Sequence, residues 1–294
     1  MGADPLDLVC FSYLADAQVM RVDAYPRANG GAMVNEVVAS IAGDGPLTAV
    51  TAAQLGLHTA LISNDVGNDP TGDQLHSWLD ATGVAHSRRR LAAGMTPQIA
   101  VVDDTRTRTW FAALDHAFTG LERADLTLLG EAGLAYIDCY QAITTGAARA
   151  IRAAGETPLM LNLGGDPLDD TISAAARGRR VAVVQTSLGE ADNDRAETIA
   201  GQLLDRLLAD TAVVTLGSLG ALAVTRTGLH RVAAEHVTVS HTHGAGAAFS
   251  AGYAHALISG ADVPAALGAG CAVGTRHCTS PAAPVPRRLP ALAA

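Results

Sequence analysis

The sequence contains no lysine: all 20 of its Lys and Arg positions are arginine. This absence excludes enzymes that form a Schiff base through a lysine, and it excludes nucleotide-binding loops that need a lysine on the phosphates. Any cationic recognition of an anion must therefore come from arginine or from backbone N–H groups.

Cysteine is also sparse, and no pair has the Cys-x-x-Cys spacing. The four cysteines are far apart or in apolar runs (Cys10, Cys139, Cys271 and Cys278). This pattern argues against a disulfide scaffold and against a zinc site, and it favours buried, reduced thiols.

Positive charge is in deficit, since 29 acidic residues give a net charge of −9. We therefore expect neither nucleic acid nor an anionic membrane as a partner. The first residues carry Asp4 and Asp7 in place of a basic segment, and no apolar run is long enough to cross a bilayer. We expect a cytoplasmic protein without a signal peptide.

What the chain does have is enough apolar residues, 49% of 294, to bury a large core. Apolar segments of strand length, such as Leu6–Leu14 and Val181–Gln185, alternate with helical patterns such as Asp192–Ala209. This order predicts an α/β fold with a doubly wound, mainly parallel sheet and helices on both faces. We expect one domain over 1–280 and a tail over 281–294.

Polar residues stand where several of these strands end, and the carboxyl ends of parallel strands are where α/β proteins build their sites. Such positions are occupied by Asp16, Asp138, Tyr140 and Asn162, and the candidate substrate ligands are Asp16, Asp138 and Asn162. Capping of a turn is the alternative for each of them.

The most informative stretch is 241–252, which reads HTHGAGAAFSAG. The β-rich run Val237–Ser240 leads into it, and a helix of small residues leaves it near Ala247. Gly244 and Gly246 allow the backbone to turn and to direct successive N–H groups at one point. Together with the helix dipole, such a turn predicts an anion hole.

This stretch resembles the signature of the ribokinase family of sugar kinases, the phosphofructokinase-B (PfkB) group, which reads Asp-Thr-x-Gly-Ala-Gly-Asp-x-Phe. Gly244, Ala245, Gly246 and Phe249 match it. His241 replaces the first Asp, and Ala247 stands at the position of the second, which is the catalytic base in the family.

Two other motifs occur in the family's order, and two more are matched in part. Thr215, Gly217 and Gly220 match its Thr-x-Gly-x-x-Gly loop, and 66–72 matches its Gly-x-Asp-x-x-Gly turn, where Asp69 or Thr71 would cap a helix. Gly43 and Gly45 match part of its Gly-Gly-x-Gly-x-Asn motif, but Leu47 replaces the Asn. Glu190 is retained from Asn-x-x-Glu, whereas Ser187 replaces that Asn.

The resemblance implies a ribokinase-like fold with a small β-lid, formed by 17–42 and 97–113, that pairs two subunits into a homodimer. It implies ATP and Mg²⁺ as cofactors and a sugar or nucleoside as substrate. It assigns the nucleotide to Thr215, Gly217, Ser218, Gly220 and Glu190, with Glu190 also organising Mg²⁺ through water. It assigns the substrate to Asp16, Gly43, Asp44 and Gly45, with Asn35 and Arg108 as lid contacts. The alternative for the two lid residues is an ordinary exposed strand position, and for Glu190 it is a favourable interaction with a helix dipole.

The missing base leaves three hypotheses open. The chain is a sugar or nucleoside kinase with a degenerate site, a non-kinase enzyme that uses the anion hole on a small anionic metabolite, or an inactive sugar- or nucleotide-binding protein. If the strand before the turn continues, His241 and His243 point the same way and could act as acid and base in the first two cases. A structural role is the alternative for both, and two ligands alone make a poor metal site.

Overall fold

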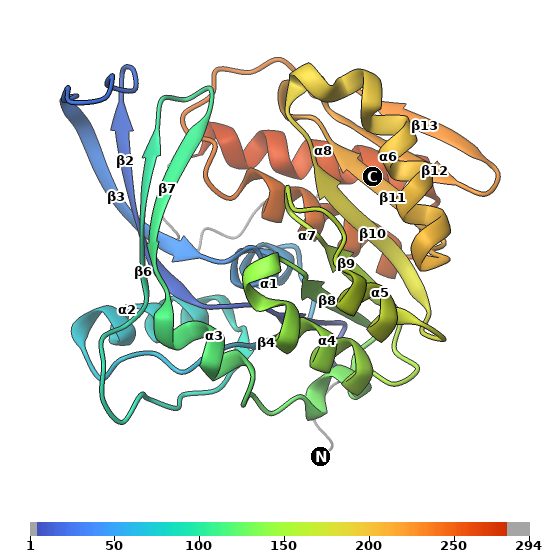
Figure 1. The fold of residues 1–294 in the computed structure, drawn as a ribbon, viewed down its shortest axis with the longest axis horizontal. Helices are drawn as coiled ribbons and strands as arrows, with labels where there is room; N and C mark the ends of the chain where they lie inside the picture. Colours follow the sequence, from blue (N-terminus) through green and yellow to red (C-terminus); the bar gives the residue numbers. More distant parts are fainter. Residues whose placement is uncertain (1–4, 281–294) are drawn as a thin grey trace.

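A nine-stranded sheet runs through the centre of the protein, as the computed structural model shows for residues 5–280 (Figure 1). The strands from β11 to β5 pair in parallel, whereas β12 and β13 form an antiparallel hairpin at one edge. The fold is thus the mainly parallel α/β sheet that the sequence predicts. In spatial order the strands are β13 (Gly228–Val232), β12 (Ala221–Thr225), β11 (Thr211–Thr215), β10 (Val181–Ser187), β9 (Leu159–Asn162), β8 (Leu134–Asp138), β1 (Leu8–Phe11), β4 (Thr59–Ile62) and β5 (Ala85–His86).

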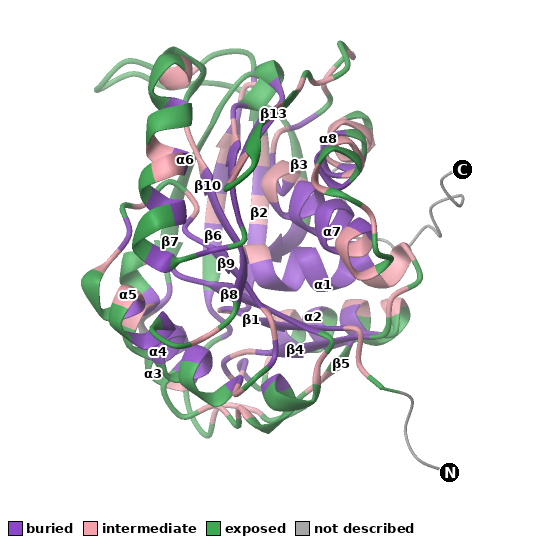
Figure 2. Cartoon of the chain, turned by 90° about the vertical axis from the view of Figure 1, so that its right-hand side faces the viewer, coloured by how far each residue is buried: buried purple, intermediate pink, exposed green. Residues whose placement is uncertain are grey.

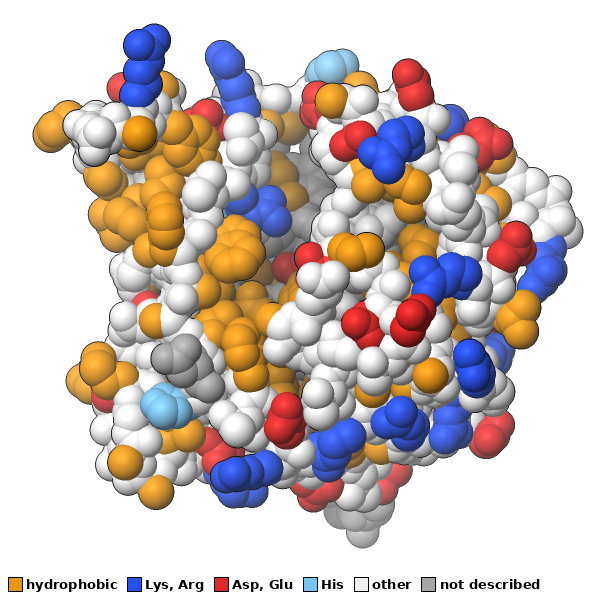
Figure 3. Space-filling model, viewed as in Figure 1, with side chains coloured by type: hydrophobic (Ala, Val, Ile, Leu, Met, Phe, Trp, Pro, Cys, Tyr) orange, Lys and Arg blue, Asp and Glu red, His pale blue; other side chains and the backbone are white. Residues whose placement is uncertain are grey.

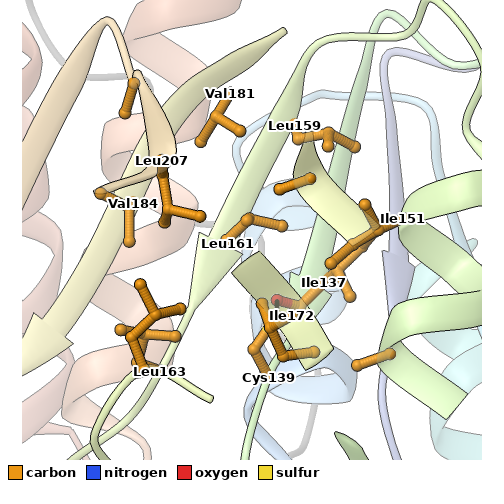
Figure 4. Packing of buried hydrophobic residues seen from close by; sticks show 14 of the residues in the cluster. Ile137, Cys139, Ile151, Leu159, Leu161, Leu163, Ile172, Val181, Val184 and Leu207 are labelled. Atoms are coloured by element: carbon orange, nitrogen blue, oxygen red, sulfur yellow. Dashed lines mark hydrogen bonds between the residues drawn. The ribbon is translucent and has the colours of Figure 1, made fainter. Parts of the chain in front are cut away.

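Helices cover both faces of this sheet, because its strands are apolar on both sides. In β9, Leu159 and Leu161 join one core cluster and Met160 joins the other. Figure 4 shows Leu159 and Leu161 beside Ile151 and Ile172 of the covering helices. The first face carries α3 (Asp115–Leu121), α4 (Thr144–Ala153), α5 (Asp170–Ala176) and α6 (Asn193–Leu207), and the second carries α1 (Asp44–Gln54), α2 (Pro70–Thr82), α7 (Ala245–Ile258) and α8 (Val263–Thr279).

Helix α7 is apolar almost all round, and its small residues let it pack closely between α1 and α8. Figure 2 shows α1 and α7 as largely buried helices. The cap of α2 follows the sequence prediction, because Asp69 accepts a hydrogen bond from Gly72 N. In the part of the chain that the structure describes, no helix is long and apolar enough to cross a membrane.

A second, four-stranded sheet stands beside the body (Figure 1) and is called the lid here. Its order is β3 (Val34–Ala42), β2 (Ala15–Val22), β6 (Gln98–Asp103) and β7 (Arg108–Ala113). These strands lie within 15–42 and 98–113, so the first segment begins two residues before the expected 17. The expected tail, 281–294, lies outside the described residues.

Two of the predicted strands are wrong. The run Leu6–Leu14 is not one strand, because β1 ends at Phe11 and the lid strand β2 begins at Ala15. The Asn64 side chain binds both Leu14 N and Leu14 O and so holds the chain where it leaves the sheet. The run Val237–Ser240 belongs to neither sheet of the described chain, and the hairpin β12–β13 forms the edge instead.

Candidate active site

The turn between Thr242 and α7 places a helix N-terminus at the surface of a cavity. Gly244 is the N-cap with φ of +77°, and a Cβ there would lie 2.9 Å from His277 Nε2, so glycine fits this position best. The helix begins at Ala245, slightly before the predicted start. Among the described residues no side chain caps this end, which leaves N–H groups of the first turn free for a ligand.

The cavity has a volume of about 660 Å³ and collects residues that are far apart in the sequence. It lies between the lid hairpin and the body, where Figure 3 shows a hollow. Its walls include Arg106, Arg108, Ser187, Glu190, Thr215, Gly217, Ser218, Gly220, Thr242, Ala245, Gly246, Phe249, Cys271 and Cys278. The structure therefore brings together the residues that the sequence assigns to the nucleotide and those of the glycine turn.

Glu190 and the loop after β11 form one unit at this cavity. Glu190 Oε1 accepts hydrogen bonds from Ser218 N at 3.0 Å and Ser218 Oγ at 2.6 Å. These bonds hold the pKa of the Glu190 carboxyl below its ordinary value, so it is ionised at neutral pH. Gly217 and Gly220 both have positive φ, and a Cβ on Gly220 would lie 2.1 Å from Val232 O. The loop therefore needs its glycines, and an ionised carboxylate at its side suits a hydrated Mg²⁺.

A buried polar network lies at the carboxyl ends of β1, β8 and β9. Asp138 Oδ2 accepts hydrogen bonds from Ser12 Oγ at 2.5 Å and Gly45 N at 2.9 Å, and Asn162 Nδ2 donates to Asp138 Oδ1 at 2.8 Å. Burial, together with the charge of Asp44, raises the pKa of Asp138 to about 7. Asp138 thus fixes the N-terminus of α1 and does not reach the solvent itself.

Asp44 is the half-buried member of the same network, at the start of α1. Its Oδ2 accepts hydrogen bonds from Tyr140 OH at 2.5 Å and from Asn162 Nδ2 at 3.2 Å. Gly45 allows the start of α1 to approach Ser12 closely, since a Cβ on residue 45 would lie 2.4 Å from Ser12 Cβ. The structure therefore unites Asp44, Gly45, Asp138 and Asn162, four of the predicted substrate residues, with Gly43 next in the chain.

Asp16 and Asn35 are not part of this network. Asp16 pairs with Gln98 in the lid, so it faces the opposite side of that sheet from Arg108, and it accepts a hydrogen bond from Gln18 Nε2. Asn35 is exposed in β3 and donates to Asp23 Oδ1 across the lid. Their roles as substrate ligands stay predictions.

The two histidines do not lie on a strand, so the condition under which their side chains would point the same way is not met. His243 is buried, and its Nε2 lies 3.0 Å from Ile41 O. His241 packs edge-on against His277 and lines a separate cavity of about 300 Å³ with Arg21 and Asp103. Burial lowers the pKa of both residues, to about 4 for His243. Both rings are therefore poor proton carriers in this arrangement, and their acid–base role stays a prediction.

Ala247 is fully buried, and its carbonyl accepts a hydrogen bond from Thr48 Oγ1 at 3.2 Å. Leu47 lies close by, since its Cδ1 would be 3.1 Å from a Cβ on Gly244. Apolar side chains therefore occupy both positions at which the resembled family carries polar ones.

Sequence reasoning missed two residues that hold the site together. Ser12 binds Asp138, and Asp103 binds the turn through Thr242. Tyr140, which the sequence places at a strand end together with Asp138, binds Asp44. Ser12 and Asp103 gave no signal, because a serine after an apolar run and an aspartate near a hairpin turn are common.

Several solved structures share this fold. A ribokinase from Thermotoga maritima superposes with a TM-score of 0.76 at 19% identity, covering 96% of this chain and 97% of that chain. A microbiome-derived acarbose kinase gives 0.74 at 22% identity, with 95% and 94% covered. An adenosine kinase from Sinorhizobium meliloti gives 0.75 at 17% identity, with 96% of each chain covered. At these identities the likeness shows the fold alone.

No curated protein matches the sequence. Residues 6–287 match the pfkB family carbohydrate kinase domain. The match spans nearly the whole chain and agrees with the signature turn, the glycine loop and the lid. The chain therefore belongs to the PfkB family of carbohydrate kinases.

Proposed function

We propose that the chain is a PfkB-type phosphotransferase that binds ATP with Mg²⁺ in the 660 Å³ cavity and transfers the terminal phosphate slowly to a hydroxyl of a small sugar-like or nucleoside substrate. One observation carries this proposal: the uncapped N-terminus of α7 and the Glu190–Ser218 loop face the same cavity. The backbone N–H groups and the dipole of α7 favour phosphate there.

The acceptor side of the proposal rests on the network around Asp44. Asp44 Oδ2 is held by Tyr140 and Asn162, which leaves Oδ1 to accept a hydrogen bond from a substrate hydroxyl. The structures that share the fold include kinases of a sugar derivative and of a nucleoside, which is the chemistry of such a hydroxyl.

The reaction is expected to be slow because no carboxylate stands at position 247. The acceptor oxygen forms its bond to the terminal phosphorus, the bond from that phosphorus to the bridging oxygen breaks, and ADP leaves with the electron pair. The hydroxyl proton must then pass to water instead of a protein base. A general base contributes about 10²–10⁴-fold, whereas positioning and electrostatic stabilisation supply most of the catalysis in phosphoryl transfer.

The experiment is titration calorimetry of the protein with ATP–Mg²⁺, with Gly246→Asp as the test variant. A Cβ on Gly246 meets no atom within 4 Å, so the new carboxylate fits but occupies the phosphate position with the wrong charge. We expect wild type to bind ATP–Mg²⁺ and the variant to bind at least about tenfold more weakly, a loss of about 1.4 kcal/mol.

Gly201→Asp is the matched control, because Gly201 is also helical and also has open space at its Cβ, but does not line the cavity. Turnover of ATP with a panel of monosaccharides and nucleosides is the second readout. A wild type that does not bind ATP–Mg²⁺ contradicts the proposal. Binding without any transfer would leave a nucleotide-binding protein and reject the phosphotransferase.

A further inference from the structure

The lid is tied to the turn that precedes α7 through Asp103, the last residue of β6. Asp103 Oδ2 accepts hydrogen bonds from Thr242 N at 2.8 Å and from Thr242 Oγ1 at 2.7 Å. Its Oδ1 accepts a third from Thr105 N at 2.6 Å. The residue is 1% exposed, so this carboxylate depends on these donors and breaking them would be costly. Lid and turn are therefore held in one arrangement.

Arg108 is placed by the same connection. It pairs with Asp103 across the β6–β7 ladder, so both side chains leave the same face of the lid. Arg108 Nη1 lies 3.5 Å from Thr242 O, a long contact that steers the side chain more than it stabilises it. Arg108 also lines the 660 Å³ cavity together with Ala245 and Gly246. Figure 3 shows a basic side chain that reaches from the lid into the hollow.

The guanidinium of Arg108 has no carboxylate partner among the described residues, although ion pairs engage several other arginines of the chain. The charge of Arg108 acts within the site: burial is the main cause of the lowered pKa of His243, and the Arg108 charge lowers it further. An unpaired guanidinium beside uncapped N–H groups offers planar, charged donors to a phosphate oxygen. In a chain without lysine, arginine is the residue type left for this purpose.

We propose that Arg108 binds the terminal phosphate of the nucleotide, opposite the N-terminus of α7, and that Asp103 is the positioning residue that holds the lid where Arg108 can do so. This inference rests on the proposed function, and it adds a cationic side chain from the lid to the phosphate-binding site. The phosphate would then lie between the backbone donors of the turn and the guanidinium of the lid.

The test compares two nucleotides, because only ATP carries the phosphate that Arg108 contacts. Calorimetry with ATP–Mg²⁺ and ADP–Mg²⁺ gives an affinity ratio for wild type and for Arg108→Ala. Loss of a charged hydrogen bond weakens binding about tenfold or more, so we expect the ATP affinity to fall by that factor and the ADP affinity to change less than about twofold. Arg108→Lys keeps the charge without the planar fork and is expected to lie between the two.

Arg27→Ala removes the same charge from an exposed part of the lid and is the matched control. Asp103→Asn tests the positioning role: the amide oxygen can still accept from Thr242, but without charge, so the ATP affinity is expected to fall while the ADP affinity shows that the fold is intact. If Arg108→Ala weakens both nucleotides equally or neither, the inference is overturned and the proposed function stands. If wild type binds neither ADP–Mg²⁺ nor ATP–Mg²⁺, both the inference and the proposed function are overturned.

Discussion

Asp138 is the residue whose protonation links the site to the stability of the fold. It is fully buried, and burial with the charge of Asp44 raises its pKa from 3.8 to about 7. In the unfolded chain the same carboxyl ionises near pH 4. Between these values the folded state keeps a proton that the unfolded state has lost, so stability falls as pH rises from about 4 to about 7.

The prediction is that Asp138→Asn removes this part of the pH dependence. A rise of the pKa from 3.8 to about 7 corresponds to a loss of stability on the order of 4 kcal/mol between about pH 4 and pH 7. Urea denaturation at pH 5, 6, 7 and 8 should show the variant gaining stability relative to wild type as pH rises. Asp169→Asn is the control: hydrogen bonds from Thr171 lower the pKa of this exposed cap, so it does not titrate in this range. If the stability of Asp138→Asn and of wild type depended on pH in the same way, the raised pKa of Asp138 would be contradicted.

The residues of the site differ in how far the sequence could reveal them. Asp138 and Asn162 end parallel strands, and a general rule places such residues at one edge of the sheet. Gly217 and Gly220 were identified through their resemblance to the family's glycine loop, and their positive φ explains why that loop carries glycines. Asp103 could not be found in this way, because its role depends on a contact with Thr242, which is 139 positions later in the chain.

Among the elements, helix α1 shows best how a glycine sets the geometry of the site. Gly43 is its N-cap with φ of +104°, and Gly56 follows its end with φ of +102°. A Cβ on Gly43 would lie 2.1 Å from Tyr13 O, whereas a Cβ on Gly56 meets nothing within 4 Å. Both positions have a positive φ, and they differ in the space available for a Cβ.

Gly43→Ala and Gly56→Ala therefore separate the two effects. An alanine at positive φ costs about 1 kcal/mol, and that cost applies to both variants. Gly43→Ala must also displace the backbone at Tyr13, which adds about 1–3 kcal/mol or more. Urea denaturation of both variants should show this difference. Equal losses in the two variants would mean that the start of α1 can move away from Tyr13 freely.

Elements with a clear apolar period were predicted well, and those that depend on distant partners were not. The helix predicted over 192–209 was found to within two residues, because it covers the sheet with one apolar face. The run Val237–Ser240 has strand-forming residues but no neighbouring strand to pair with, so propensity alone misled. Only contacts distant in the sequence could have settled such cases.

At the scale of the molecule, the lid gathers several of the large exposed hydrophobic side chains of the described residues. Large hydrophobic side chains are more than half exposed there, and Figure 3 shows them gathered over this part of the molecule. They are Met33, Val37, Trp110 and Phe111. A small sheet with exposed apolar residues on both faces is poorly stable alone, and such patches mark interaction sites. We propose that a second copy of the chain covers this lid in a homodimer.

Sedimentation velocity over a range of concentrations tests this proposal, with Phe111→Glu as the disrupting variant. Phe111 is 67% exposed, and a charge buried at that position in an interface should raise the dimer dissociation constant by at least about tenfold. Leu208→Glu is the matched control, because Leu208 is 74% exposed at the end of α6 in the body. Wild type and the control should sediment as dimers, and Phe111→Glu should shift towards the monomer. A monomeric wild type, or equal behaviour of the two variants, would leave the lid as a surface that closes over its own cavity without a partner.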